Sequence, residues 1–313
     1  MNFLDICSAL QQRGELIDRH IGKGRGPNEV LGYNYSAVSD KLYCFLNGGN
    51  SGLAFFNKKF TKEKEYRIDW EIKRSKKEVL ANPIPEIGDS YEFDFGMPGI
   101  FKVWNDKQVS VAVTASHPKF NGYFNSELYY NYSRVLAIIN INTGKIDKLI
   151  GRRPPIYLLH KNIPNFDHFN YEVTNENVFV NFWADSTIYV IDKKTDLAIG
   201  KFGHPGKNMN ANYPTTQSYE DAEDNWREDR NNFGFYHYIK YIPTENTMYR
   251  GYTKGKDETT DGLQIYRGYN MVGDFSVPKG IEVIGEANGE IYAINSNDEN
   301  MLRIYKIKFN HEN

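Results

Sequence analysis

Groups of four short segments rich in Tyr, Phe, Val and Ile recur along this sequence, with Gly, Asn and Asp turn signals between them. The clearest group has its strands at residues 169–174, 178–184, 187–192 and 197–202. Such a small sheet cannot bury its own faces, so copies of it must stack on one another. Repeats of about 40 to 50 residues built in this way predict an all-β fold of the β-propeller type.

A second group covers residues 235–277, with the hairpin signal Thr244-Glu245-Asn246 between its first two strands. Weaker copies occupy residues 31–72 and 100–150. The two ends of the chain supply further strands at residues 3–8, 15–21, 281–287, 290–295 and 302–309. The groups therefore account for nearly the whole chain.

The uneven ends allow two blade counts. If residues 15–21 pair with residues 302–309, the propeller has about five blades; if residues 3–21 are half of their own blade, it has about six. A propeller usually completes its last blade with a strand from the other end of the chain, because an open blade leaves an unpaired strand edge. We favour six blades with an incomplete N-terminal blade. On this interpretation residues 1–313 are a single propeller domain that lacks an N-terminal segment, and five blades is the alternative.

The composition excludes several kinds of partner. Among 313 residues, 38 Lys and Arg stand against 40 Asp and Glu, and this net charge of −2 argues against a nucleic-acid-binding surface. Cys7 and Cys44 lack the spacing of a zinc site or a disulfide framework. We therefore expect no metal and no cofactor.

The N-terminal residues have no basic region followed by an apolar run, so they do not form a signal peptide. No stretch approaches the roughly 20 apolar residues that span a bilayer. If the chain is complete as given, it is cytoplasmic. A missing N-terminal piece, which we favour, could carry an export signal.

Two short motifs carry a family resemblance. The turn at residues 21–29, Ile-Gly-Lys-Gly-Arg-Gly-Pro-Asn-Glu, resembles the G-x-G-P-x-E turn of six-bladed β-propeller lipoproteins of Bacteroides-like bacteria. Residues 236–241 and Met248-Tyr249-Arg250 are similar to a Tyr-rich pattern in one uncharacterised branch of that group. The resemblance implies a periplasmic or cell-surface protein held by a lipid in its intact precursor. It supplies no catalytic residues, and this sequence shows neither the signal nor the lipid-bearing cysteine.

The long loops are where a propeller of this kind is expected to bind. The candidate ligand-binding residues in or beside them are Arg25, His117, Arg152, Arg153, His204, Trp226, Arg227 and Arg230. Ser218 and Asp221 resemble a helix cap, so the segment that follows predicts a short helix. Its Trp226 could stack on a ligand ring while an arginine meets a carboxylate; the alternative is a solvated helix packed on the propeller.

The other candidates also have a structural alternative. Glycines around Arg25 could form an anion-binding nest, although a blade-linking turn is the interpretation we favour. The histidines are scattered, and no nucleophile, base and orienting group occur at a recognisable spacing. This favours a protein that is not an enzyme.

Three functions remain open from the sequence. The first is noncatalytic binding of a small polar ligand, a glycan or a protein. The second is a carbohydrate- or lactone-acting hydrolase or lyase with its site at the central channel mouth. The third is a structural or interaction scaffold.

Overall fold

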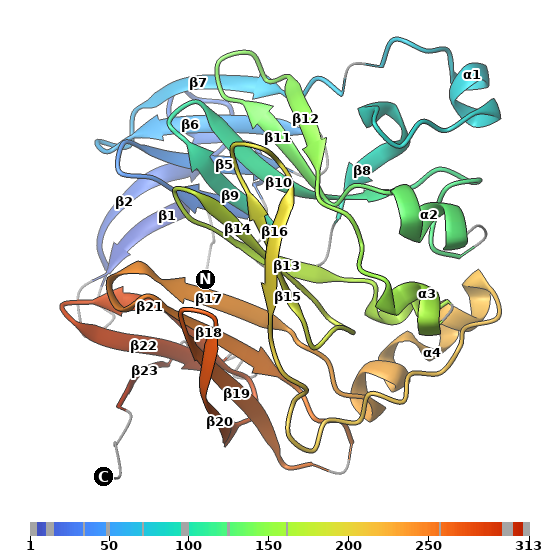
Figure 1. Cartoon of the computed structure of the whole chain (residues 1–313). Coiled ribbons are helices and arrows are strands. Elements are labelled where there is room, and N and C mark those ends of the chain that lie inside the picture. The colour runs from blue at the N-terminus through green and yellow to red at the C-terminus, as the bar shows by residue number, and fades with distance from the viewer. Residues whose placement is uncertain are drawn as a thin grey trace. The chain divides into compact units, whose positions relative to one another are not determined.

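The computed structural model describes residues 5–10, 16–33, 35–47, 51–70, 72–94, 100–123, 126–160, 162–256, 258–295 and 303–308 (Figure 1). The chain forms two compact units. One comprises Met1–His117 and Ser133–Ile150, and the other comprises Pro118–Tyr132 and Gly151–Asn313.

The first unit contains two antiparallel meanders, one of four strands and one of five, and a smaller sheet. The first meander is β4 (Tyr35–Val38), β5 (Leu42–Asn47), β6 (Gly52–Asn57) and β7 (Lys62–Arg67). The second runs through β8 (Tyr91–Phe93), β9 (Phe101–Asn105), β10 (Gln108–Ala115), β11 (Leu136–Asn140) and β12 (Ile146–Ile150). The smaller sheet is β1 (Asp5–Leu10), β2 (Leu16–Lys23) and β3 (Glu29–Val30), and the helical segments are α1 (Lys76–Ala81) and η1 (Gly88–Ser90).

The inner edge of the second meander is shared by two strands. β9 pairs with the first half of β10, and β8 pairs with its second half. Apolar residues of both meanders form one core, which includes Cys44 and Phe55. Burial raises the pKa of the Cys44 thiol to about 12, as expected for an inert core cysteine.

The second unit contains three meanders. They are β13 (Phe169–Val173), β14 (Asn177–Phe182), β15 (Ile188–Asp192) and β16 (Ala198–Phe202); β17 (Tyr238–Ile242), β18 (Thr247–Tyr252), β19 (Thr260–Arg267) and β20 (Asn270–Pro278); and β21 (Ile281–Ala287), β22 (Glu290–Asn295) and β23 (Ile304–Ile307). Its helical segments are α2 (Ser126–Tyr132), α3 (Ile156–His160), η2 (Pro164–Phe166), α4 (Tyr219–Asn232) and η3 (Pro243–Glu245).

Burial falls from the middle strands to the outer strand of a meander. Every residue of β18 is buried, whereas β20 has only exposed and half-buried residues. The hydrophobic residues of β18 and β19 therefore fill the space against neighbouring meanders. The outer strand leaves apolar side chains at the surface.

A polar network joins the β13–β16 and β17–β20 sheets. The buried Arg250 donates from Nε to Asn181 Oδ1 at 2.7 Å and packs its guanidinium 3.4 Å from the centroid of the Tyr236 ring. Asn181 donates in turn to Asn170 Oδ1 at 2.8 Å. Two residues of the Tyr-rich motifs, Tyr236 and Arg250, are therefore structural.

The fold is the all-β propeller predicted from the sequence, with five antiparallel meanders as its blades. The count of six blades is wrong, and the alternative of five is confirmed. β1 and β2 pair with each other, but β2 and β3 are parallel, so this small sheet is not a blade meander. Parts of the predicted strands at residues 3–8, 15–21 and 302–309 lie outside the described residues.

Candidate functional site

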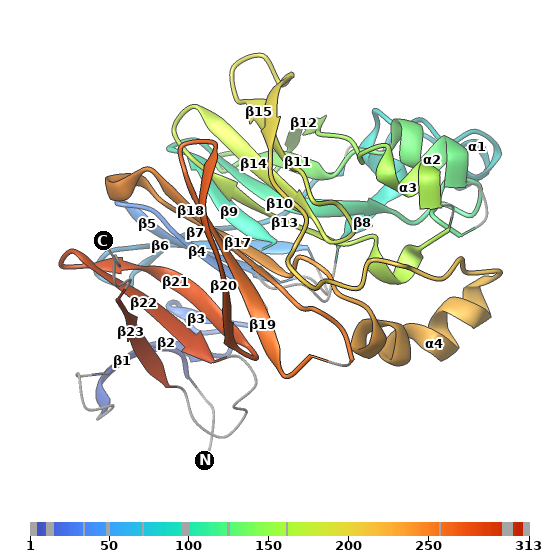
Figure 2. The same ribbon diagram turned by 60° about the horizontal axis from the view of Figure 1, so that its bottom comes forward.

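Helices gather at one end of the strands in the second unit. α2 contacts α3, and α4 contacts η2 (Figure 2). α4 begins as the sequence predicts: the Asp221 backbone N–H donates to Ser218 Oγ at 3.1 Å, and Glu220 and Asp221 occupy the first turn. The predicted helix over this segment is confirmed.

Two buried residues hold α4 against η2. Ala222 and Asp229 face the interior, and Asn165 Nδ2 donates to the Ala222 carbonyl at 3.0 Å and to Asp229 Oδ2 at 2.8 Å. Burial raises the pKa of Asp229, while the Asn165 hydrogen bond opposes that rise. Asn165 therefore makes two hydrogen bonds to the inward side of the helix.

A stripe of α4 beside these buried residues carries four side chains, Tyr219, Glu223, Trp226 and Arg230, spaced by four, three and four residues. Trp226 is 45% exposed, and the Arg230 guanidinium lies 3.9 Å from its ring centroid. Cation and ring attract each other at this distance. The indole is therefore held in place although it is open to solvent.

Arg230 also reaches an inner aromatic layer. Its guanidinium carbon lies 4.5 Å from the Trp183 ring centroid, and Trp183 stacks on Phe235 with 4.3 Å between the ring centroids. Trp226, Arg230, Trp183 and Phe235 thus form a continuous ladder from the surface to the core. This ladder preorganises the exposed indole.

Arg153 is buried beneath the helices. Its Nε donates to Asp167 Oδ1 at 2.6 Å, and its guanidinium lies 4.3 Å from the Tyr129 ring centroid. Burial opposes the charge of Arg153, but Asp167 outweighs this effect and raises the pKa of the guanidinium. Arg153 therefore fixes the chain around α2 and α3, and the structure does not place it at the surface.

The remaining candidates lie in different surroundings. Arg152, Arg227 and His204 are exposed residues of the second unit. His117, in the first unit, is buried with Nε2 2.9 Å from the Val79 carbonyl oxygen. Among the candidates of the second unit, Trp226 and Arg230 are in contact, and Arg227 is next to Trp226 in the sequence of α4. Their role in binding remains a prediction.

Arg25, in the first unit, is exposed on the turn between β2 and β3. A carboxylate of the same chain, that of Glu29, already fills the nest of backbone amides next to Arg25. The Gly26 N–H donates to Glu29 Oε2 at 2.6 Å. A Cβ at Gly24 would clash with the same oxygen, so any side chain there would displace the carboxylate. The anion-binding position of this turn is thus taken by the Glu29 carboxylate.

Three tyrosine hydroxyls hold the loop around His204. The backbone N–H groups of His204, Gly206 and Lys207 donate to the hydroxyls of Tyr266, Tyr236 and Tyr252 at 3.1, 2.9 and 2.8 Å. The carbonyl of His204 accepts from Gln264 Nε2 at 3.1 Å. The path of this loop is therefore set by side chains of the β17–β20 sheet and its flanking residues.

Two inner partners of the site were not predicted from the sequence. Asp167 neutralises Arg153, and Trp183 supports Arg230, but neither was a candidate. The available signal was a tryptophan directly after the apolar strand β14, where the chain turns away. Among the described residues, no group of three or more His, Cys, Asp or Glu side chains is placed to hold a metal ion.

No family model matches the chain, and no curated protein matches it. It is similar in structure to a member of the DUF4221 family from Bacteroides vulgatus, with a TM-score of 0.67 and 14% identity over 94% of this chain and 84% of the other. This likeness shows a common fold.

Two weaker likenesses accompany it. A Bacteroides fragilis protein whose name proposes that it is exported has a TM-score of 0.49 and 14% identity, over 92% of this chain and 73% of the other. The β-propeller domain of Cps50 (Swd1) from Myceliophteria thermophila has a TM-score of 0.45 and 9% identity, over 94% and 73%. Within the described part of this chain, no helix has the length and apolar character needed to cross a bilayer.

Proposed function

We propose that this propeller is a noncatalytic binding protein that recognises a glycan through the exposed stripe of α4. The observation that carries the proposal is the Trp226 indole, which is 45% exposed yet fixed on one face by Arg230. Because the ring is already held in one position, it loses little conformational entropy when a ligand binds, and the binding free energy is more favourable for that reason.

The neighbouring side chains fit a saccharide better than a purely apolar partner. A sugar ring has one face of C–H groups, which packs on an indole, and a rim of hydroxyls, which hydrogen-bond to carboxylate and guanidinium groups. Within the stripe, Glu223 lies one helical turn before Trp226, and Arg230 lies one turn after it. The stripe therefore combines an apolar platform with polar groups on both sides.

An extracytoplasmic location and a lipid anchor in the intact precursor belong to the same proposal. They rest on the motif resemblance at residues 21–29 and 236–241. Labelling of cells with a radioactive fatty acid, followed by isolation of the full-length gene product, tests this part. A product without label in the soluble cell fraction contradicts it.

Affinity gel electrophoresis tests glycan binding, with dextran, laminarin and polygalacturonate each cast into the gel. We expect at least one polysaccharide to retard the protein, and Trp226→Ala to weaken this retardation about tenfold, because a stacked ring contributes about 1 to 1.5 kcal/mol.

Tyr269→Ala is the matched control, because Tyr269 is also an exposed ring stacked on a neighbour, Phe202, but lies outside α4. It should leave retardation unchanged. Absence of retardation by all three polysaccharides, or equal retardation of the Trp226→Ala variant, would count against the glycan role.

A further inference from the structure

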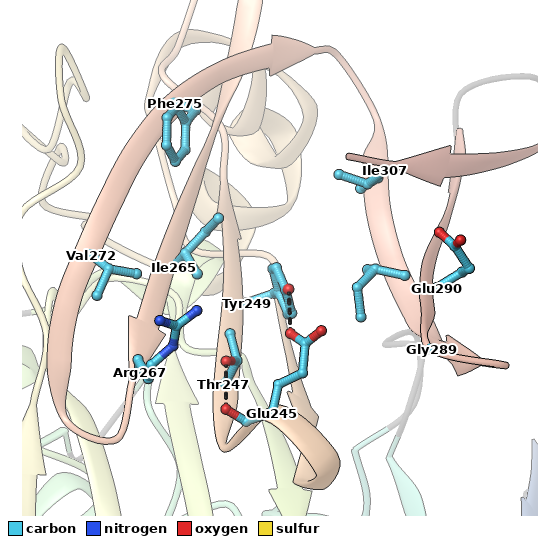
Figure 3. Close-up of a pocket in the computed structure, with 11 residues that line it drawn as sticks. Glu245, Thr247, Tyr249, Ile265, Arg267, Val272, Phe275, Gly289, Glu290 and Ile307 are labelled. Atoms are coloured by element: carbon cyan, nitrogen blue, oxygen red, sulfur yellow. Dashed lines mark hydrogen bonds between the residues drawn. The ribbon is translucent and has the colours of Figure 1, made fainter. Parts of the chain in front are cut away.

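A groove of about 600 Å³ lies between the β17–β20 and β21–β23 sheets, and its residues take no part in the α4 stripe (Figure 3). Its volume is within the range of small-molecule sites in proteins. The lining residues are Glu245, Thr247, Tyr249, Ile265, Arg267, Val272, Phe275, Gly289, Glu290, Ile291 and Ile307. All of them belong to the second unit.

Part of the groove wall is apolar. Val272 and Phe275 on β20 are 55% and 47% exposed, and Figure 3 shows them on one side of the groove with Ile307 on the other. Ile265 and Ile291 are buried and complete the apolar surface. A ligand that covers these side chains removes apolar surface from water, which favours binding.

Three charged residues of the lining differ in how they are neutralised. Glu290 Oε1 pairs with Lys306 Nζ at 2.6 Å. The Arg267 side chain makes no ion pair or hydrogen bond within the described part of the chain, and it is exposed beside Tyr249. The groove therefore offers a guanidinium whose donors are available.

Glu245 provides the opposite charge. Its Oε2 accepts from the Tyr249 hydroxyl at 3.3 Å, and Thr247 Oγ1 donates to its carbonyl at 3.0 Å, so the residue is positioned without a cation. Burial, together with the carboxylate of Glu245, raises the pKa of Tyr249, which keeps that hydroxyl protonated as a donor. In Figure 3 Arg267 lies toward the Val272 side and Glu245 toward the Glu290 side.

From this arrangement we infer that the groove binds a small apolar zwitterion, namely a short apolar peptide with free ends. Its carboxylate meets Arg267, its ammonium group meets Glu245, and its side chains cover Val272, Phe275 and Ile307. A purely anionic apolar ligand leaves the Glu245 carboxylate without a counter-ion, and a purely cationic one leaves Arg267 without a counter-ion. The inference is independent of the glycan proposal, because no residue is shared.

Isothermal titration calorimetry of the whole chain tests the inference with three probes: the dipeptide leucyl-phenylalanine, its N-acetyl form and its C-terminal amide. We expect the free dipeptide to bind about fivefold more tightly than either blocked form, because each blocked form loses one charge-assisted hydrogen bond at a partly solvated position.

Two substitutions close a cycle with these probes. Arg267→Gln should weaken the free dipeptide about fivefold and leave the amide unchanged, while Glu245→Gln should weaken the free dipeptide and leave the N-acetyl form unchanged. Lys201→Gln, which removes an exposed charge on β16, is the control and should change nothing. No binding of the dipeptide, equal binding of a blocked form, or equal effects of both substitutions on all probes overturns the inference.

Discussion

Arg250 is buried at the junction of two sheets and donates to oxygen atoms that carry no formal charge. Its partners are Asn181 Oδ1 and the carbonyls of Asp185 and Ser186. Burial lowers the pKa of its guanidinium, so these hydrogen bonds and the Tyr236 ring must compensate for lost hydration.

Replacing this arginine removes donors from buried acceptors. We expect Arg250→Met to lower the free energy of unfolding by about 3 kcal/mol, since each unsatisfied buried group costs about 1 to 3 kcal/mol. Urea unfolding followed by tryptophan fluorescence measures the change. Arg152→Met, at an exposed position, should differ from the parent by no more than about 0.5 kcal/mol. A small effect for both variants contradicts the structural role of Arg250.

His237 makes stability depend on pH. Burial lowers the pKa of its imidazole to about 4 from an ordinary value of 6.5, so between these values the unfolded chain binds a proton that the folded chain does not. The contribution of His237 to stability is complete above pH 6.5 and is lost as the pH falls toward 4. We expect a loss of about 2 kcal/mol over this window, because the side chain remains partly exposed. Urea unfolding at pH 7 and pH 4.5 measures it, and in His237→Gln the loss should shrink by that amount; an unchanged pH dependence excludes this histidine as its source.

At the scale of elements, Asn165 is one of the side chains that attach α4 to the rest of the second unit. Asn165 supplies two hydrogen bonds to the inward face of the helix. We expect Asn165→Ala to raise the amide exchange rates of α4 about tenfold while those of β14 stay constant, because the loss of about 1.4 kcal/mol is confined to local opening. Asn231→Ala, at an exposed position of the same helix, should slow or preserve exchange. Equal exchange in both variants shows that η2 does not anchor the helix.

The elements themselves were predictable where the signal was local. The strands of the clearest group and the helix start at Ser218 were found from alternation, turn residues and a cap. β8 was not predicted, because its three residues become a strand only by pairing with β10, which follows 15 residues after its end in the chain. The ladder of Arg230 and Trp183 was not predicted for the same reason, because the fold and not the sequence spacing brings these two residues together.

At the scale of the whole molecule, the sequence predicted the propeller but overcounted its blades. Each strand group shows its own alternation and turn residues, and the groups follow one another along the chain. The fold class therefore follows from local patterns. The blade count depends on which strands the chain ends pair with, and that choice is made by long-range hydrogen bonds. The parallel pairing of β2 with the two-residue β3 has no signature in strand alternation.

The turn at Gly24 to Glu29 has a consequence for how this protein responds to salts and buffers. The carboxylate that reaches the Gly26 amide is tethered by three residues of the same chain, so its effective concentration there is at least in the millimolar range. Phosphate, sulfate or acetate must displace this tethered group before reaching the amide. We therefore expect these anions not to bind at this glycine-rich turn. Melting temperatures recorded in different buffers can then be compared without a correction for anion binding at that position.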